Sequence, residues 1–287
     1  MKKFSKIRTE RMAFNIRKHI CNTIIRHGEG HGGSALSCAD ILAVLYSSVM
    51  DFDPQDPCSP DHDKFLLSAG HKCLALYGAL VETGVVDASV LETYNQLGTT
   101  VPCHPDMTKL KGVQFSSGSL GHGLPIGCGI ALADKERGNG RKTFVLMGDG
   151  EHGEGSIWEA AGFAAQHRLD NLTAIIDENG LQINGTTRQI LYPADFEKRY
   201  GGFGWSIRKV DGHNLQELHS ALSSVPFEPG KPSAVIAETI KGKGISFMEN
   251  NIAYHHWDPG EEERIRATDE LKREELELRE REAELCR

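Results

Sequence analysis

Residues 143–150 read Thr-Phe-Val-Leu-Met-Gly-Asp-Gly and join an apolar run to a Gly-Asp-Gly turn. A second apolar run, at residues 172–176, ends just before Asp177-Glu178-Asn179-Gly180. Continuous apolar runs of this length are typical of buried parallel strands, whose carboxyl ends form the ligand-binding edge of an open α/β sheet. The sequence therefore predicts that Asp149 and Asn179 emerge side by side at that edge.

These two polar residues favour a site for a metal and a diphosphate. A carboxylate and an amide oxygen are hard ligands suited to Mg²⁺ or Ca²⁺, with Mn²⁺ as a further candidate. Gly150 lets the backbone approach a phosphate, and a helix expected from about Glu151 to His167 would favour anions at its N-terminus. A Gly-Asp-Gly triplet also occurs as a plain turn capped by the aspartate, so the triplet alone leaves both interpretations open.

The apolar pattern along the chain predicts alternating helices and strands. Such alternation implies right-handed crossovers and an α/β fold with a mostly parallel sheet covered by helices on both faces. We expect residues 1–258 to form one domain. Helical periodicity covers residues 7–27, 37–50, 70–83, 122–136, 154–167 and 214–223, and strand-like runs cover 64–68, 143–148, 172–177, 205–210 and 233–239.

Bulk composition is ordinary for a globular protein, with 287 residues, 39% hydrophobic and 25% charged. The net charge of −8 argues against nucleic acid as the main partner. We also expect no membrane segment, because no apolar stretch approaches the roughly 20 residues that a span needs. The basic N-terminus leads into a helical pattern and not into a signal core, so cytoplasm is the expected location. Seven scattered cysteines without a Cys-x-x-Cys pair are typical of reduced structural thiols.

Residues 259–287 change abruptly in composition and predict a charged C-terminal helix. Residues 261–287 hold eleven acidic and seven basic side chains, while Leu271, Leu278 and Leu285 recur every seven residues. The pattern fits either a surface helix with one weak apolar edge or a helix that docks on another surface.

Several further blocks follow one another along the chain. Gly30–Ser37 contains His31, Leu67–His71 ends in a histidine, and His104–Met107 precedes Gly118–Gly123. Thr239–Asn251 leads to Tyr254-His255-His256. With the runs 148–161 and 169–185, these blocks closely resemble the thiamine diphosphate-binding domain of transketolases, over about residues 10–258. The likeness is strongest to the N-terminal subunits of transketolases that are split into two polypeptides.

The resemblance implies a role for each matching residue. It implies a metal site at Asp149, Asn179 and the Leu181 carbonyl, and diphosphate contacts from the Gly150 N–H, Asn179, His71 and His255. It places Gly118, Ser119 and Leu120 against the aminopyrimidine ring of thiamine diphosphate, and His31 and His104 beside the sugar as catalytic residues. It also assigns Glu154 and Glu159 to the link between paired active sites at the subunit interface.

The chain departs from the family pattern at three positions. Gly32 stands where the family usually has proline, His122 where it usually has glutamine, and His256 where it often has glycine. The two extra imidazoles would either pack structurally or alter the choice of acceptor sugar.

The implied function is that of the N-terminal subunit of a two-subunit transketolase. Such an enzyme uses thiamine diphosphate and a divalent metal to transfer a two-carbon ketol unit from a ketose, which we expect to be phosphorylated, to an aldose. The family's glutamate that contacts the aminopyrimidine comes from a pyrimidine-binding domain, so we expect a partner subunit that carries it, in an α2β2 assembly. Two alternatives remain open. The first is another thiamine diphosphate enzyme, either the decarboxylating subunit of a 2-oxo acid dehydrogenase or a 1-deoxyxylulose phosphate synthase-like subunit. The second is a non-catalytic cofactor-binding module.

Overall fold

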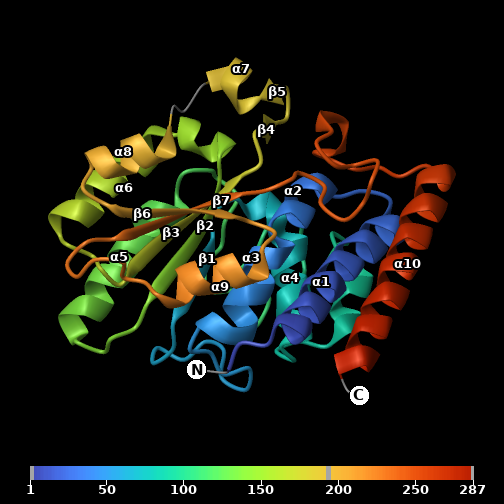
Figure 1. Cartoon of the computed structure of the whole chain (residues 1–287), viewed down its shortest axis with the longest axis horizontal. Coiled ribbons are helices and arrows are strands. Elements are labelled where there is room, and N and C mark those ends of the chain that lie inside the picture. The colour runs from blue at the N-terminus through green and yellow to red at the C-terminus, as the bar shows by residue number, and fades with distance from the viewer. Residues whose placement is uncertain (1–2, 192–194, 286–287) are drawn as a thin grey trace.

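A five-stranded parallel sheet forms the centre of the protein (Figure 1). The computed structural model of the chain describes residues 3–191 and 195–285. The strand order is β1-β2-β3-β7-β6, with bounds β1 Lys64–Leu67, β2 Thr143–Gly148, β3 Leu172–Glu178, β7 Ser233–Glu238 and β6 Ser206–Asp211. Each neighbouring pair in this order runs parallel, so the polar segments after β2 and β3 meet at one edge.

Strand side chains alternate between two hydrophobic cores, one on each face of the sheet. Phe144 and Leu146 belong to the first core, whereas Val145 and Met147 belong to the second. This alternation follows from the two-residue period of a strand, and both faces are covered because β2 is apolar throughout. The expected α/β fold with helices on both faces is confirmed.

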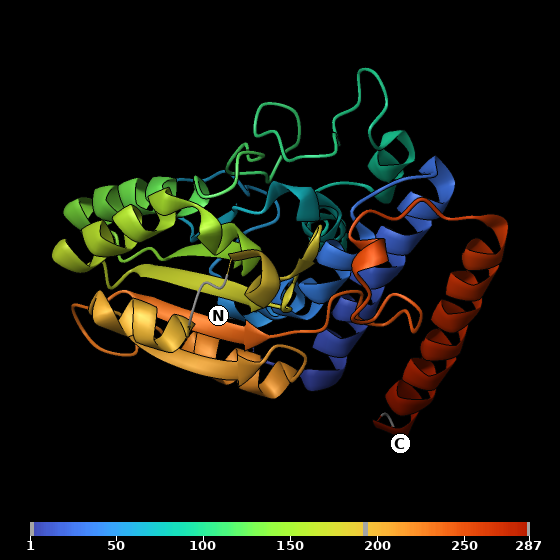
Figure 2. The same ribbon diagram turned by 90° about the horizontal axis from the view of Figure 1, so that it is seen from above.

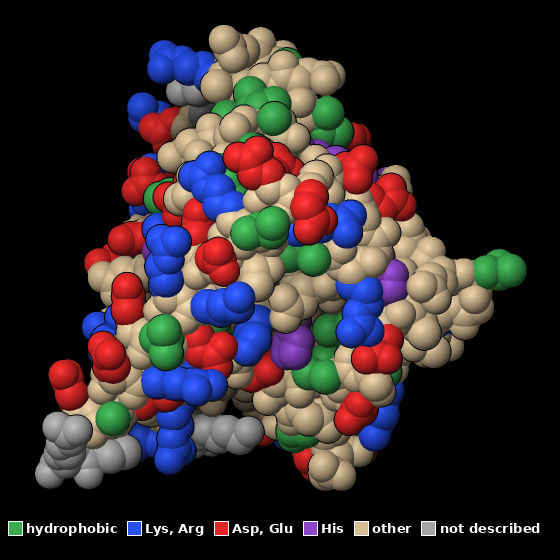
Figure 3. Space-filling view, turned by 90° about the vertical axis from the view of Figure 1, so that its right-hand side faces the viewer, with side chains coloured by type: hydrophobic (Ala, Val, Ile, Leu, Met, Phe, Trp, Pro, Cys, Tyr) green, Lys and Arg blue, Asp and Glu red, His purple; other side chains and the backbone are tan. Residues whose placement is uncertain are grey.

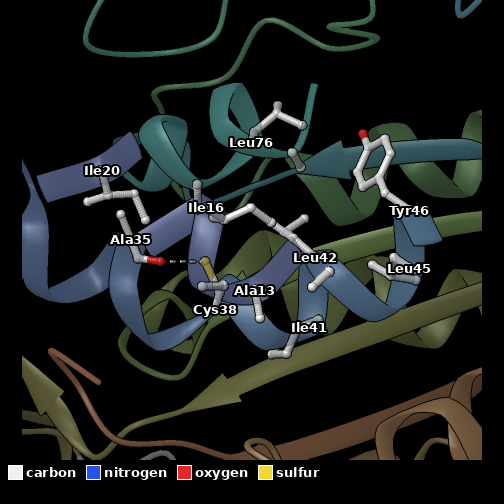
Figure 4. Close-up of a cluster of buried hydrophobic side chains, with 14 of the residues drawn as sticks. Ala13, Ile16, Ile20, Ala35, Cys38, Ile41, Leu42, Leu45, Tyr46 and Leu76 are labelled. Carbon is white, nitrogen blue, oxygen red and sulfur yellow. Dashed lines mark hydrogen bonds between the residues drawn. The ribbon is translucent and has the colours of Figure 1, made fainter. Parts of the chain in front are cut away.

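Two groups of helices supply the outer layers (Figure 2). The first core contains side chains from α1 Lys6–His27, α2 Gly32–Ser37, α3 Ala39–Val44, the π-helical turn Leu45–Val49, α4 Cys73–Glu82 and α9 Leu215–Ser223. The second contains side chains from α5 Gly123–Arg137, α6 Gly155–Gln166 and α8 Phe196–Gly202. Figure 4 shows part of the first core, which includes Ile16 and Ile20 of α1, Ile41 and Leu42 of α3, and Leu76 of α4.

The charged C-terminal segment forms α10, Glu261–Leu285, which packs along α1 at the outer side of the molecule (Figure 1). Leu271 and Leu278 are buried, whereas Leu285 is 70% exposed, so the seven-residue pattern contributes only two leucines to the contact. Ion pairs flank them, including Lys18 Nζ to Glu275 Oε2 at 2.9 Å. Figure 3 shows acidic and basic side chains intermixed over this face. The division of the chain near residue 258 remains a prediction.

Some expected boundaries differ from the structure. The helix expected at 37–50 begins earlier, at Gly32, and is broken into short segments. The helix expected from Glu151 is preceded by a 3₁₀ turn, Gly150–Gly153, and begins after Glu154, whose ψ of 128° is extended. The sequence did not predict four short elements, because segments this short show no periodicity. They are the hairpin strands β4 Leu181–Gln182 and β5 Gly185–Thr186, and the helices α7 Thr187–Leu191 and α8. Further 3₁₀ turns lie at Gly70–Lys72, Ala88–Thr93 and Ile252–Tyr254.

Two bulk expectations can be compared with the described residues. Among them, no helix is long and apolar enough to cross a membrane. The six cysteines that the structure describes are free thiols, and Cys286 lies outside the described residues.

Candidate active site

A cavity of about 360 Å³ lies at the carboxyl edge of the sheet. The strand ends, the start of α2, the turn before α4 and the 239–256 segment all contribute to its wall. It is lined by these residues that the sequence singled out: His31, His71, His104, Gly118, Leu120, Asp149, Gly150, Asn179, Leu181 and His255. Segments spread over more than 200 positions therefore converge on one space.

Asp149 and Asn179 follow the adjacent strands β2 and β3, in which Gly148 pairs with Asp177. Both are buried, at 3% and 9% exposure. The Gly180 N–H donates to Asp149 Oδ2 at 2.6 Å, and the Leu181 N–H donates to Asn179 Oδ1 at 3.1 Å. These backbone bonds hold a carboxylate and an amide oxygen at the cavity wall.

The donor set of this corner fits a hard divalent cation. Burial first, and then the charge of Asp177, raise the pKa of Asp149 to about 6. A cation beside the carboxylate would reverse that shift by favouring the charged form. A Cβ at position 150 would lie 2.7 Å from Gln182 Cγ, so any larger residue there would have to displace the Gln182 side chain. The Gly150 N–H donates to Asp149 Oδ1 at 2.7 Å, so it already has a partner within the chain.

Four histidines of the cavity wall form a cluster. The ring centroid of His31 lies 5.4 Å from that of His71, 6.2 Å from that of His104 and 5.6 Å from that of His255. His71 and His255 are themselves 5.3 Å apart. His256, whose role the sequence left open between packing and acceptor choice, places its ring centroid 4.9 Å from His31 but is exposed.

Burial keeps these imidazoles in the neutral form near pH 7. Burial, together with the neighbouring His256, lowers the pKa of His31 to about 4. Burial and the charge of Lys241 lower the pKa of His255 to about 3, and burial also lowers the pKa values of His71 and His104. A neutral imidazole carries one donor and one acceptor, so each ring can both give and receive a hydrogen bond.

Two buried lysines complete the site, and sequence reasoning missed both. Lys241 is 1% exposed, and its Nζ donates to Ser34 Oγ at 3.1 Å and to His255 Nδ1 at 2.9 Å. Since Nδ1 of His255 accepts that bond, the ring proton of the neutral imidazole is on Nε2. Burial, and then repulsion from Lys72, lower the pKa of Lys241 to about 8.

Lys72 also lines the cavity and forms a buried ion pair with Asp177, at 1% and 0% exposure. Ser37 Oγ and Thr239 Oγ1 also donate to the Asp177 carboxylate. Burial opposes both charges, yet their attraction raises the pKa of Lys72 and lowers that of Asp177. Lys241 lies inside the 239–251 block and Lys72 directly follows the 67–71 block, so their position was the available signal.

Glu151 is a third residue that sequence reasoning left without a role. It is 3% exposed, and its carboxyl accepts bonds from the Gly121 N–H at 2.8 Å, the Gly148 N–H at 3.1 Å and the Ser68 hydroxyl. Burial raises its pKa. Glu151 thus ties the 118–123 loop to the end of β2.

The remaining predicted residues lie outside the cavity wall. Ser119 is exposed, and so are Glu154 and Glu159 at the start of α6. His122 is exposed too, and its Nδ1 lies 3.0 Å from the Leu120 carbonyl oxygen. The assigned roles of the three predicted residues remain predictions.

Comparison with known proteins agrees with this geometry. The family model described as "Transketolase, thiamine diphosphate binding domain" matches residues 8–275. A 6-deoxy-6-sulfo-D-fructose transketolase subunit of Clostridium sp. (strain MSTE9) is 41% identical over 259 residues, which cover 90% of this chain and 94% of that relative. One of the apulose-4-phosphate transketolase subunits, from Actinobacillus succinogenes, is 43% identical over 246 residues, which cover 85% of this chain and 88% of that relative.

Solved structures show the same fold. A mutant transketolase from Pichia stipitis superposes with a TM-score of 0.86 at 28% identity, covering 93% of this chain and 41% of that chain. The transketolase from Campylobacter jejuni gives 0.85 at 29% identity, covering 94% and 43%. This chain therefore spans less than half the length of those two enzymes. By sequence, fold and the convergence of its site residues, the chain belongs to the transketolase family and corresponds to its thiamine diphosphate-binding domain.

Proposed function

We propose that this chain is the N-terminal subunit of a two-subunit transketolase. The observation that carries the proposal is that Asp149 and Asn179 line one cavity together with His31, His71, His104 and His255. In this proposal, thiamine diphosphate supplies the chemistry that moves a two-carbon ketol unit from a ketose to an aldose. The chain would bind the cofactor, orient the sugar and move protons.

The diphosphate and its metal would occupy the corner between β2 and β3. Asp149, Asn179 and the Leu181 carbonyl are oxygen donors for Mg²⁺, or for Ca²⁺ or Mn²⁺. The ammonium group of Lys241 supplies positive charge at the cavity wall, and His255 offers an Nε2–H donor. Both suit an anion, and we assign His71 to the same end of the cofactor.

The sugar would lie against His31 and His104. As neutral rings, they can donate a hydrogen bond to a sugar hydroxyl or accept its proton, which typically contributes about 10²- to 10⁴-fold in rate. Gly118, Ser119 and Leu120 would support the aminopyrimidine, and Gly118 lies beside His104, since a Cβ there would be 3.7 Å from His104 Cδ2.

We propose that a second polypeptide supplies the pyrimidine-binding domain, in a cytoplasmic α2β2 assembly. The curated relatives support this, because they are named as subunits and this chain covers about nine-tenths of their length. Exposed Glu154 and Glu159 would lie at the contact between paired sites. The relatives' names specify a sulfonated and a phosphorylated sugar, so we propose a ketose donor with an anionic end.

The test is to assay the chain with and without its partner, using ketoses that end in phosphate, sulfonate or hydroxyl. We expect transfer only in the mixture, and faster with the anionic ketoses. Substantial turnover by the chain alone would contradict the proposal of two subunits.

The metal site is tested separately by calorimetry with Mg²⁺ and thiamine diphosphate. Asp149→Ala is expected to abolish binding without unfolding the chain, because it removes one oxygen ligand. Asp53→Ala, at an exposed carboxylate outside the cavity wall, is the matched control. Equal affinity in the two variants would refute the site.

A further inference from the structure

A second buried polar cluster lies behind the 239–245 segment, on elements that the proposed mechanism does not use. It consists of Arg17 on α1, Asp40 on α3 and His213 in the loop between β6 and α9. Arg17 Nη2 and His213 Nδ1 both contact the same oxygen, Asp40 Oδ2, the latter at 2.7 Å. Arg17 and Asp40 are 6% and 5% exposed, so this cluster, which we call the Arg17 array, is almost closed to solvent.

The far side of the His213 ring determines which nitrogen carries the proton. The backbone N–H of Ile240 donates to His213 Nε2 at 2.8 Å. A backbone N–H can only donate, so Nε2 must be an acceptor and the ring proton must be on Nδ1. Nδ1–H then donates to Asp40, which holds the ring in the one tautomer that can accept from Ile240.

Ile240 stands between two residues of the candidate active site. The preceding residue, Thr239, donates its hydroxyl to Asp177, and the following residue, Lys241, reaches Ser34 and His255. The segment has left the sheet here, since β7 ends at Glu238. The bond to His213 therefore replaces a strand partner for the backbone that places Lys241.

The surroundings leave the array little freedom. A Cβ at Gly244 would lie 2.8 Å from Arg17 Cδ, so the 239–245 segment packs directly on the guanidinium side chain. Burial opposes the charge of Arg17, but Asp40 and Glu274 of α10 raise its pKa on balance. Buried ion pairs of this kind are often no more stabilising than apolar residues of the same size, so a merely space-filling role would not require one.

We propose that Arg17, Asp40 and His213 are positioning residues that hold residues 239–241 so that the Lys241 ammonium faces the diphosphate end of the cavity. The effect on cofactor binding rests on the proposed function. The effect on the position of residues 239–241 depends only on the hydrogen bond between His213 and Ile240. Two measurements separate these parts.

The first measurement is amide hydrogen exchange of the whole chain in His213→Phe. Phenylalanine keeps most of the ring volume but removes both hydrogen bonds, so exchange across residues 239–245 should rise about tenfold, while β3 and β7 stay protected. His219→Phe is the matched control, because His219 lies on α9 and stacks on Phe4 at 4.3 Å, a contact that phenylalanine preserves. Unchanged exchange in His213→Phe would overturn the inference.

The second measurement is calorimetric titration with Mg²⁺ and thiamine diphosphate. We expect His213→Phe to weaken binding about tenfold and His219→Phe to leave it unchanged. In a Lys241→Met background, His213→Phe should cause no further loss, because the array acts through Lys241. Equal losses in both backgrounds, or faster exchange with unchanged affinity, would overturn the positioning role.

A failure of the proposed function is distinguishable. If the wild-type chain binds no thiamine diphosphate with or without its partner, the cofactor assignment falls, while the exchange experiment still decides whether His213 holds the segment. If His213→Phe does not fold, His213→Gln, which retains one donor and one acceptor, is measured in the same two ways. For His213→Gln we expect an exchange rate and a binding affinity between those of the wild type and those of a complete loss of the two hydrogen bonds. A wild-type exchange rate together with a loss of binding would contradict the inference.

Discussion

Replacing Lys72 by methionine should destabilise the protein far more than the loss of a surface lysine would. The Lys72 ammonium is 1% exposed and pairs with Asp177, which is fully buried. Methionine fills similar space, so the change removes the charge and leaves little cavity. The Asp177 carboxylate then keeps the Ser37 and Thr239 hydroxyls as donors, together with the more distant Asn179 Nδ2 at 3.4 Å, but no positive charge of Lys72.

The expected cost is about 3–5 kcal/mol, the typical penalty for leaving one partner of a buried pair uncompensated. Two hydroxyl donors remain on Asp177, which favours the lower half of that range. At about 2 °C per kcal/mol for a chain of this size, the Tm should fall by roughly 6–10 °C. Urea unfolding followed by tryptophan fluorescence measures the change in the free energy of unfolding.

The pH dependence gives an independent check. In the wild type, the folded-state pKa of Asp177 lies below its ordinary value, so the stability it contributes is present above about pH 4 and is lost only as the pH falls through the lower folded value. Without Lys72, burial should raise that pKa above the unfolded value. The deficit of Lys72→Met should therefore be largest near pH 7 and shrink toward pH 5.

The double variant Lys72→Met/Asp177→Asn is the control, because it removes the uncompensated charge. It should recover most of the lost stability at pH 7. The reasoning would be refuted if Lys72→Met were within about 1 kcal/mol of the wild type, a change typical of exposed ion pairs. A double variant no more stable than the single one would refute it equally.

Three further outcomes follow from the site. His104→Ala should lower ketol transfer by about 10²- to 10⁴-fold with little change in cofactor affinity; a calorimetric loss as severe as that of Asp149→Ala would contradict its sugar-facing role. The affinity of the chain for pyrophosphate should fall as the pH rises through about 8, where the Lys241 ammonium loses its proton. In Lys241→Met the affinity should not change over this pH range. The same pH profile in both proteins would rule out a contact between Lys241 and the diphosphate. Gly33→Ala should disturb the 254–256 turn and weaken cofactor binding, because its Cβ would lie 2.6 Å from the Tyr254 carbonyl oxygen; unchanged affinity and thermal stability would disprove the steric argument.

The sheet and the meeting of Asp149 and Asn179 at one of its edges could be predicted because their signals are local. The runs 143–147 and 172–176 are apolar at nearly every position, which is what burial on both faces demands, and the polar residues after them then fall at one edge. The histidines could be assigned only by resemblance to transketolases. Nothing in the spacing of His31, His71, His104 and His255 shows that they share one cavity.

Tertiary structure alone decided the electrostatics of the site. Lys72 and Lys241 resemble any surface lysine in sequence, and their burial depends on what packs over them from distant segments. His213 likewise gains its tautomer from Asp40, 173 positions earlier, and its function from the backbone of Ile240. Apolar periodicity records which side of a strand or helix is buried, because that property repeats along the chain. The partner of a buried charge is a single long-range contact, so no local pattern of residues records it.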